Sequence, residues 1–325
     1  MSISELRGLL PGVDAASGQR IPAHVAGKLP ADTVGAGRVP AGVRLAVTGT
    51  ARGLRLRLEP GEPTPVPAPT VGDELAIWVG DELVSRVQVT TGTVEVELPD
   101  RAPDAVVEIY LPEGKAWRVA GATPLAGELA AAPRGPRWVA YGDSITQGWS
   151  VSAPGLAWPS VVARTLGLDL VNLGFAGSAR GELPAAVAVA ESQADVVTLA
   201  WGTNAWSSIP TDPAHIAETM RLFLTAVRQG LPDVPVIVVS PIVRPDAETT
   251  PNRFGAGLAQ LRTAIEAEVL RFASQHGDAR LVLLPGLDLV SADQLVDGVH
   301  PGDAGHAAFA KGVAAVMAEA LGSQH

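Results

Sequence analysis

A few side chains in this 325-residue sequence have the types and spacing that nucleophilic catalysis needs. Ser144 lies in VAYGDSITQG, where a short apolar run ends in a Gly-Asp-Ser turn. Asp297 and His300 stand three positions apart in DGVH. A serine becomes an effective nucleophile when a base takes its proton, and that base is usually a histidine oriented by a carboxylate. We therefore predict that Ser144 attacks an ester carbonyl, with His300 as the base and Asp297 as the orienting carboxylate.

The oxyanion that forms in this reaction needs hydrogen-bond donors placed in advance, each worth roughly 10²–10³ in rate. The candidate donors are the backbone N–H of Ser144, a glycine N–H in the segment 174–177 and the side-chain amide of Asn204 in GTNA. Other roles remain open for the same residues. Ser144 is also a favourable helix N-cap, Asp143 is expected to bond the N–H groups of its own turn, and Asn204 could be an ordinary loop residue.

Four further side chains are candidates for substrate binding because they follow the same segments or lie past predicted strand ends. Trp149 and Trp206 could form pocket walls, since binding sites are often lined with aromatic rings, and core packing is the alternative. Arg180 and Arg244 could hold a carboxylate or phosphate through two hydrogen bonds, and a surface salt bridge is the alternative.

The elements that must position these residues alternate between apolar runs and helical patterns. The runs are nearly all apolar, which is typical of parallel strands buried on both faces by helices. We predict strands at 137–141, 169–173, 195–201, 235–240 and 280–285, and helices near 157–167, 182–192, 214–229, 256–276 and 304–321. Ligands of such sheets bind at the carboxyl ends of the strands. The candidate residues follow the first three strands and the last one, so we expect them on one rim.

The N-terminal half has a different periodicity. Polar and apolar residues alternate in six short segments, which predicts an antiparallel sandwich. These segments are 43–47, 54–58, 74–79, 83–89, 93–98 and 106–111. The proline-rich stretch 60–69 is expected to be a loop because proline cannot donate to a strand ladder. We predict an accessory β-sandwich, jelly-roll-like, over 1–125, a linker over 126–136 and a catalytic domain over 137–325.

The motifs resemble, in order, those of the SGNH (GDSL) hydrolase superfamily. The matching blocks are Gly142-Asp143-Ser144, the segment NLGFAG at 172–177, Gly202-Thr203-Asn204 and Asp297-Gly298-Val299-His300. By this pattern the oxyanion glycine is Gly177. The family usually has an aspartate directly after its asparagine, where this chain has Ala205. The oxyanion hole should survive this change, because the asparagine acts through its own amide.

The resemblance implies a three-layer α/β/α sandwich with a five-stranded parallel sheet, and hydrolysis of esters without a metal or a cofactor. A β-sandwich ahead of such a domain is similar to the layout of some carbohydrate esterases. We expect a serine esterase that removes a short, acetyl-like group from a carbohydrate or glycosylated metabolite. The alternatives are an acyltransferase, which moves the acyl group to an alcohol, and a non-catalytic binding protein on a hydrolase fold.

Composition limits the partners and the location. The net charge is −10, and no Lys/Arg cluster appears, so we expect no nucleic-acid partner. The chain has no cysteine, which rules out thiolate chemistry and disulfides. No apolar run reaches the ~18 residues of a membrane span. We expect a small-molecule ester as the partner and a cytoplasmic location, although a trimmed sequence would leave secretion open. The oligomeric state is left open.

Overall fold

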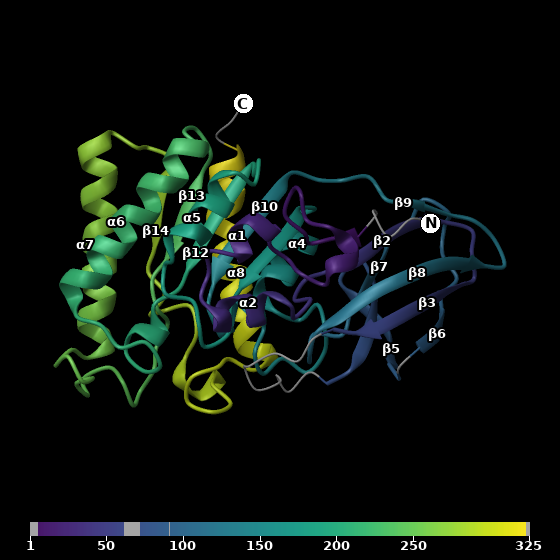
Figure 1. Ribbon diagram of the computed structural model, residues 1–325, viewed down its shortest axis with the longest axis horizontal. Coiled ribbons are helices and arrows are strands. Elements are labelled where there is room, and N and C mark those ends of the chain that lie inside the picture. The colour runs from purple at the N-terminus through teal and green to yellow at the C-terminus, as the bar shows by residue number, and fades with distance from the viewer. Residues whose placement is uncertain (1–5, 62–71, 91, 323–325) are drawn as a thin grey trace.

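The two halves of the chain fold around different sheets and lie at opposite ends of the long axis (Figure 1). The computed structural model describes residues 6–61, 72–90 and 92–322. The loop expected at 60–69 lies outside the described residues, apart from Pro60 at the end of a strand and Gly61.

The C-terminal half is built on a five-stranded parallel sheet, as predicted. The strand order is β11-β10-β12-β13-β14, so the chain starts in a central strand and adds neighbours on both sides. The strands are β10 (Arg137–Gly142), β11 (Asp169–Gly174), β12 (Val196–Ala200), β13 (Val236–Val239) and β14 (Leu281–Leu284). The switch of direction lies between β10 and β12, where open α/β sheets bind their ligands.

Helices cover both faces of this sheet. Successive strand residues point to opposite faces, so each strand contributes apolar side chains to two separate cores. Val139 and Tyr141 share a core with the helices of one layer, and Trp138 and Ala140 share a core with those of the other. The first layer contains α5 (Leu183–Ala190), α6 (Pro213–Gly230) and α7 (Leu258–His276), and the second contains α4 (Trp158–Leu166) and α8 (Asp303–Gly322). This arrangement confirms the three-layer α/β/α prediction.

The N-terminal half contains two antiparallel sheets that enclose their own apolar core. In β3, Leu54, Leu56 and Leu58 are buried and the arginines between them are exposed, which is the expected alternation. One sheet runs β1 (Leu6–Arg7), β2 (Arg44–Gly49), β7 (Val107–Tyr110), β4 (Glu74–Val79) and β5 (Glu82–Gln88), with β9 (Leu129–Ala131) beside β2, and the other runs β6 (Gly92–Glu97), β3 (Gly53–Pro60) and β8 (Trp117–Leu125).

Three strands of this β domain were not predicted from the sequence. Both β1 and β9 are too short to show a period, and β8 contains alanine, glycine and proline in WRVAGATPL. Its pairing with β3 comes from tertiary contacts, with a register shift at Arg57 and Leu58. Within the predicted linker, β9 pairs with β2. The domain limits at 125 and 136 stay a prediction.

A segment near the N-terminus packs on the α/β half. It contains the short helices α1 (Ala23–Ala26) and α2 (Ala31–Gly37), drawn in purple in Figure 1, whereas η2 (Ala15–Ser17) just before them packs on β8 and the sandwich core. Leu10, Ile21 and Val25 belong to the same core as α5, α6 and α7. Residues 10–36 therefore contribute to the core of the second half.

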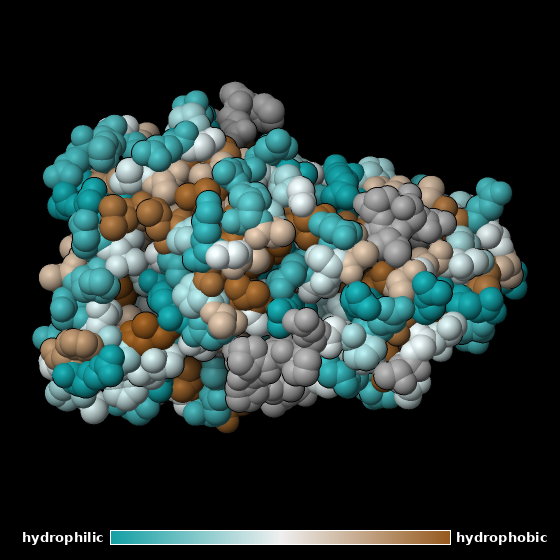
Figure 2. Space-filling model, in the orientation of Figure 1, coloured by the Kyte–Doolittle hydropathy of each residue, from teal (hydrophilic) through white to brown (hydrophobic). Residues whose placement is uncertain are grey.

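The outer surface mixes polar and apolar residues. On the face drawn in Figure 2, hydrophobic side chains lie in separate groups between hydrophilic ones. Among the described helices, none combines the length and the apolar run that crossing a bilayer would need.

Candidate functional site

The turn after β10 places the candidate nucleophile at the start of a short helix, α3 (Ser144–Gln147). Asp143 caps this helix by accepting the N–H of Ile145 at 3.1 Å. Ser144 is therefore the first helical residue and not the cap. Position 142 needs a glycine, because a Cβ there would overlap Thr146 Oγ1 and the carbonyl oxygen of Ala200.

A continuous chain of hydrogen bonds joins Ser144, His300 and Asp297. Ser144 Oγ lies 2.8 Å from His300 Nε2, although 156 positions separate the two residues. On the other side of the ring, His300 Nδ1 lies 2.7 Å from Asp297 Oδ2. In this geometry Nδ1–H donates to the carboxylate, which leaves Nε2 free to accept the serine proton.

The loop that carries the carboxylate holds it in a fixed orientation. Asp297 Oδ1 accepts the backbone N–H groups of Val299 at 3.0 Å and His300 at 2.7 Å. Gly298 has φ +79°, a left-handed conformation that favours glycine. Burial by itself raises the pKa of Asp297, but hydrogen bonds from the His300 ring and from both N–H groups outweigh it and lower the pKa below its ordinary value. Asp297 is thus an ionised partner for the imidazole.

Asn204 lies in the loop whose backbone N–H groups bond the Asp143 carboxylate, and its side chain has an unpaired donor. It lies in η3 (Thr203–Ala205), directly after β12, and is only 5% exposed. Its Nδ2 has no hydrogen-bond partner among residues 6–61, 72–90 and 92–322. A buried unpaired amide is costly, although Trp201 Nε1 and Thr203 Oγ1 of the same segment also lack a partner in the described part of the protein. The role of Asn204 as an oxyanion donor stays a prediction.

The loop after β11 is aligned on helix α3 by side-chain hydrogen bonds. Asn172 Nδ2 donates to the Thr146 carbonyl at 2.8 Å, and its Oδ1 accepts the Gly174 N–H at 2.8 Å. Gln147 Oε1 accepts the Ala176 N–H at 2.9 Å. Gly177 follows with φ +70°, which a residue with a side chain rarely adopts. These bonds tie the loop of Gly177 to the helix of Ser144.

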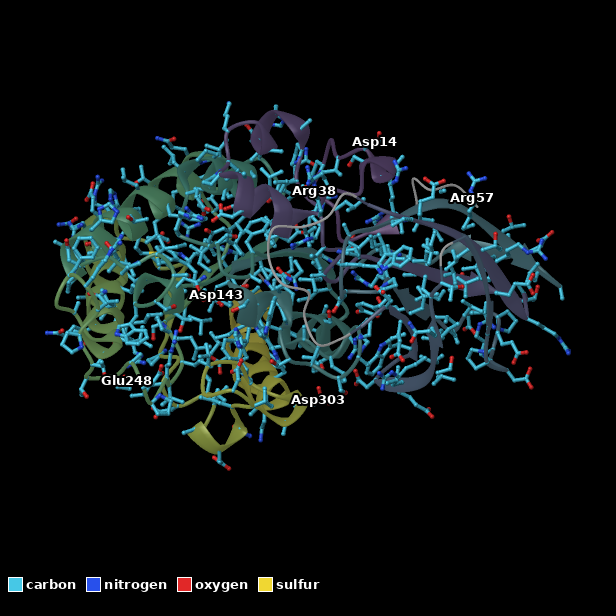
Figure 3. The ribbon with its side chains drawn as sticks, turned by 60° about the horizontal axis from the view of Figure 1, so that its bottom comes forward. Asp14, Arg38, Arg57, Asp143, Glu248 and Asp303 are labelled. Atoms are coloured by element: carbon cyan, nitrogen blue, oxygen red, sulfur yellow. The ribbon has the colours of Figure 1, made fainter. Side chains whose placement is uncertain are left out.

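Asp143 links the nucleophile turn to the loop of Asn204. Its carboxylate is buried, and burial raises its pKa to about 6. The backbone N–H groups of Ile145, Thr203 and Gly202 act in the opposite direction. Figure 3 places Asp143 deep among the side chains near the middle of the molecule. Asp143 is thus a structural residue that holds two of the loops together.

The two tryptophans predicted to line a pocket lie in different surroundings. The ring of Trp149 lies 5.7 Å from the His300 ring, centre to centre, at 33°. Trp206 Nε1 donates to the Thr250 carbonyl at 2.7 Å, and the guanidinium of Arg244 lies 4.7 Å above its ring. The structure therefore brings Trp149 to the candidate base. The substrate-binding roles of both rings stay predictions.

The two candidate arginines are engaged by carboxylates of the protein. Arg180 pairs with Asp32 and lies 3.5 Å from Glu182. Arg244 Nε lies 3.1 Å from Asp246, and its Nη1 donates to Ser207 Oγ at 3.2 Å. A role for either arginine in substrate binding stays a prediction.

One residue beside the site gave no signal in the sequence. Arg20 is 1% exposed and donates to the carbonyls of Asn172, Gly174 at 2.7 Å and Ala36 at 2.8 Å. Burial lowers its pKa to about 9. The outward carbonyls of β11 have no strand partner because β11 is an edge strand, and Arg20 satisfies two of them. Arg20 is a single arginine more than 150 positions before Asn172 and Gly174, and no sequence pattern around it reveals this contact.

A protein-family model covers the part of the chain that contains the candidate site. The model of the GDSL-like lipase/acylhydrolase family matches residues 136–318, more than half of the chain. No curated protein matches the sequence.

Solved structures with a similar fold include proteins that match both halves of the chain. A salicylyl acyltransferase, SsfX3, from a tetracycline biosynthetic pathway is 24% identical with a TM-score of 0.82 and covers 97% of this chain and 94% of its own. A structure described as a GDSL-like lipase from Bacteroides ovatus is 22% identical with a TM-score of 0.79, covering 99% and 97%. A family two carbohydrate esterase from Clostridium thermocellum, in complex with cellohexaose, is 18% identical with a TM-score of 0.63, covering 86% and 92%.

Proposed function

Since the chain belongs to the GDSL-like lipase/acylhydrolase family, we propose that it is a serine esterase acting on a short O-acyl group of a carbohydrate or glycosylated metabolite. One observation carries the proposal. A hydrogen-bonded chain runs from Ser144 Oγ through His300 to Asp297, and the buried amide of Asn204, in the loop that bonds the Asp143 carboxylate, has no partner in the described part of the protein.

In the first half-reaction, His300 Nε2 takes the proton of Ser144 as Oγ forms a bond to the ester carbonyl carbon. The carbonyl oxygen becomes an oxyanion, which the Asn204 amide and the N–H groups of Gly177 and Ser144 stabilise. Asp297 stabilises the imidazolium that forms. The carbon–oxygen bond to the alcohol then breaks, and Nε2–H gives its proton to the leaving oxygen.

In the second half-reaction, water attacks the acyl group held on Ser144. His300 takes one proton from the water and returns it to Ser144 Oγ as the acyl–serine bond breaks. The products are a free acid and the regenerated serine. Every proton is carried by the imidazole, so the residues named here are sufficient for a complete cycle.

A carbohydrate substrate is supported by the surroundings of His300 and by one structural relative. The Trp149 ring lies against the imidazole of His300, which protonates the leaving alcohol in the proposed reaction. An aromatic ring at this place suits a sugar alcohol, because it can stack on the apolar face of the sugar ring. The Clostridium thermocellum relative is a carbohydrate esterase in complex with cellohexaose. The short acyl group is inferred from the sequence, which contains no long apolar lid segment.

Acyl transfer is a second candidate, favoured by the likeness to the salicylyl acyltransferase over both halves of the chain. An acyltransferase uses the same acyl-enzyme and replaces the water of the second step with an alcohol. The catalytic residues of the two reactions are identical, so the two differ in which nucleophile reaches the acyl-enzyme.

The test incubates the protein with p-nitrophenyl esters of increasing acyl length and then with acetylated sugars, with and without added alcohols. We expect free acid as the main product, faster turnover of two-carbon than twelve-carbon esters, and no turnover by Ser144→Ala. A new ester exceeding free acid would favour acyl transfer. Failure of a fluorophosphonate probe to label Ser144 in the unmodified protein would favour the non-catalytic binding protein and contradict the proposal.

A further inference from the structure

The connection between α3 and α4, residues 149–156, carries Trp149 to the candidate base and has no regular secondary structure. We call it the Trp149 loop. Ser150 within it has φ +72°, which is uncommon for a residue with a side chain. The Trp149 N–H donates to the Ser144 carbonyl at 2.9 Å, and two further backbone bonds, Val151 to Gly148 and Leu156 to Ala153, form single turns within the connection. The segment between these turns has no backbone bond of its own, so its contacts come from neighbouring elements.

The far end of the Trp149 loop is bonded to the β-sandwich. Trp78 of β4 is 3% exposed, and its Nε1 donates to the Pro154 carbonyl at 3.0 Å. Gly155 packs directly against the same indole, because a Cβ at this position would lie 2.7 Å from Trp78 Nε1. Leu156 packs against the cluster of Ala76, Trp78 and Tyr110. The indole thus fixes both the position and the hydrogen bonding of this end of the loop.

Two arginines strengthen the same junction. The guanidinium of Arg164, from α4, lies 3.8 Å above the Trp78 ring and donates to the Gly155 carbonyl at 2.8 Å. Arg86 of β5 donates to the Ser152 carbonyl at 2.9 Å. A stacked guanidinium of this kind is a favourable contact that also orients the ring beneath it.

The other side of the Trp149 loop is held by α8, the helix that follows His300. Asp303 accepts the Ser152 N–H at 2.8 Å and the Ser152 hydroxyl at 2.6 Å. His306 Nε2 lies 3.4 Å from the Trp149 carbonyl oxygen. Figure 3 shows Asp303 at the start of the yellow helix. The loop is therefore held between the sandwich on one side and the helix next to the candidate base on the other.

We propose that Trp78 is a positioning residue for the active site: it holds the Trp149 loop from the β-sandwich and so keeps the Trp149 ring against the imidazole of His300. The proposal rests on the proposed function where it treats His300 as the base. The β-sandwich then has a direct part in catalysis. A displacement of about 1 Å at a catalytic group can cost about 10²-fold in rate, so a small shift of this loop is enough to matter.

The first test compares Trp78→Phe with Trp117→Phe. Trp117 is a matched control because it is also a buried sandwich tryptophan, 2% exposed, with one indole hydrogen bond, to Asp73 at 2.9 Å. We expect Trp78→Phe to lower kcat for p-nitrophenyl acetate roughly tenfold or more with KM little changed, and Trp117→Phe to stay within about twofold. Equal kinetics for the two variants would overturn the proposal.

A second readout separates this proposal from the proposed function. The ring protons of His300, assigned in NMR spectra by their loss in His300→Gln, sense the ring current of Trp149. We expect these resonances to shift in Trp78→Phe and to stay in place in Trp117→Phe. This result holds whether or not the protein hydrolyses esters, so an inactive protein would contradict only the proposed function. Unmoved His300 resonances in Trp78→Phe would overturn the positioning role.

A glycine pair supplies the second variant in case Trp78→Phe does not fold. Gly155→Ala places a methyl group against the Trp78 indole, whereas Gly12→Ala has a similar φ, +77° against +86°, and nothing within 4 Å. Both changes impose a similar left-handed backbone strain, so their difference reports the contacts with Trp78 and with the Arg164 guanidinium stacked on it. We expect Gly155→Ala to shift His300 and lower kcat, and Gly12→Ala to do neither. Matching behaviour of the two variants would count against the proposal.

Discussion

At the scale of single residues, the prediction for Asn204 rests on a buried donor that has no partner in the described part of the protein. Most buried polar atoms have a hydrogen-bond partner, and leaving one unpaired costs about 1–3 kcal/mol. Asn204 Nδ2 is buried without a partner in the described ranges, while Asn252 in the neighbouring loop uses both ends of its amide. The two asparagines therefore differ in what their removal should affect.

We predict that Asn204→Ala lowers kcat for a short ester by roughly 10²–10³, the loss expected for one oxyanion donor. The melting temperature should change little, because Nδ2 bonds nothing in the described protein. Asn252→Ala is the control and should have the reverse effect. It loses bonds to Thr211 at 2.8 Å and to the Phe254 N–H at 2.8 Å, so stability falls while kcat is kept. Steady-state kinetics and thermal melts measure both. Unchanged kcat in Asn204→Ala would exclude the oxyanion role.

At the scale of elements, the first turn of α8 supports the site through a buried histidine. His306 Nδ1 accepts the Trp158 N–H at 3.1 Å, which requires the neutral ring with its proton on Nε2, facing the Trp149 carbonyl. Burial lowers the pKa of His306 to about 4, and the Trp149 contact offsets this only in part. One helix thus holds both ends of the connection between α3 and α4.

We predict that the stabilising contribution of the neutral His306 ring is lost as the pH falls. Its folded pKa of about 4 is below the ordinary 6.5, so the unfolded chain takes the proton first. The stabilisation is complete above pH 6.5 and is lost as the pH falls from 6.5 toward 4, by roughly 1.4 kcal/mol per unit. His306→Gln should be less stable than the unmodified protein at neutral pH, and the difference should shrink by about 2 kcal/mol at pH 5.

Urea unfolding of both proteins at the two pH values measures this difference. His276→Gln is the control, because His276 is exposed at the end of α7 and packs on the Phe272 ring. The free energy of unfolding of His276→Gln should stay close to that of the unmodified protein at both pH values. A difference between His306→Gln and the unmodified protein that is constant with pH would show that His306 titrates alike in the folded and unfolded states.

At the scale of the whole molecule, the two halves share buried contacts. Residues near the N-terminus enter the core of the α/β half. Arg44 of β2 is buried, pairs with Glu108 at 2.6 Å and lies 3.7 Å from Asp169 of β11. A buried ion pair of this kind is costly to break, because removing one partner leaves an uncompensated charge. The halves should therefore unfold together.

We predict a single calorimetric unfolding transition for the full chain. Arg44→Met should lower the temperature of that one transition by roughly 5 °C or more, because it removes the guanidinium that pairs with Glu108 and leaves the buried Asp169 with Arg134 as its remaining ion pair. Arg55→Met removes an exposed pair with Glu95 and should have little effect. Differential scanning calorimetry measures all three proteins. Two separate transitions in the unmodified protein would contradict the shared core.

The sequence alone determined much of the architecture. Nearly continuous apolar runs predicted the five parallel strands, because a strand buried on both faces cannot alternate. The alternation of Leu54, Leu56 and Leu58 predicted a strand with one face buried, which β3 has. The GDS and GTN motifs lie just after β10 and β12, and the DGVH motif lies in the connection between β14 and α8. These features depend on residues that are close together in the sequence, so periodicity and motif spacing are enough to predict them.

Only the tertiary structure decided which distant residues meet. Ser144 and His300 are 156 positions apart, and their 2.8 Å contact depends on the strand order and on the path of the chain after β14. Trp78 and Arg20 carry no motif, yet one holds the Trp149 loop and the other the end of β11. Sequence patterns describe which face of an element is apolar, whereas contacts between elements depend on how those faces pack in space.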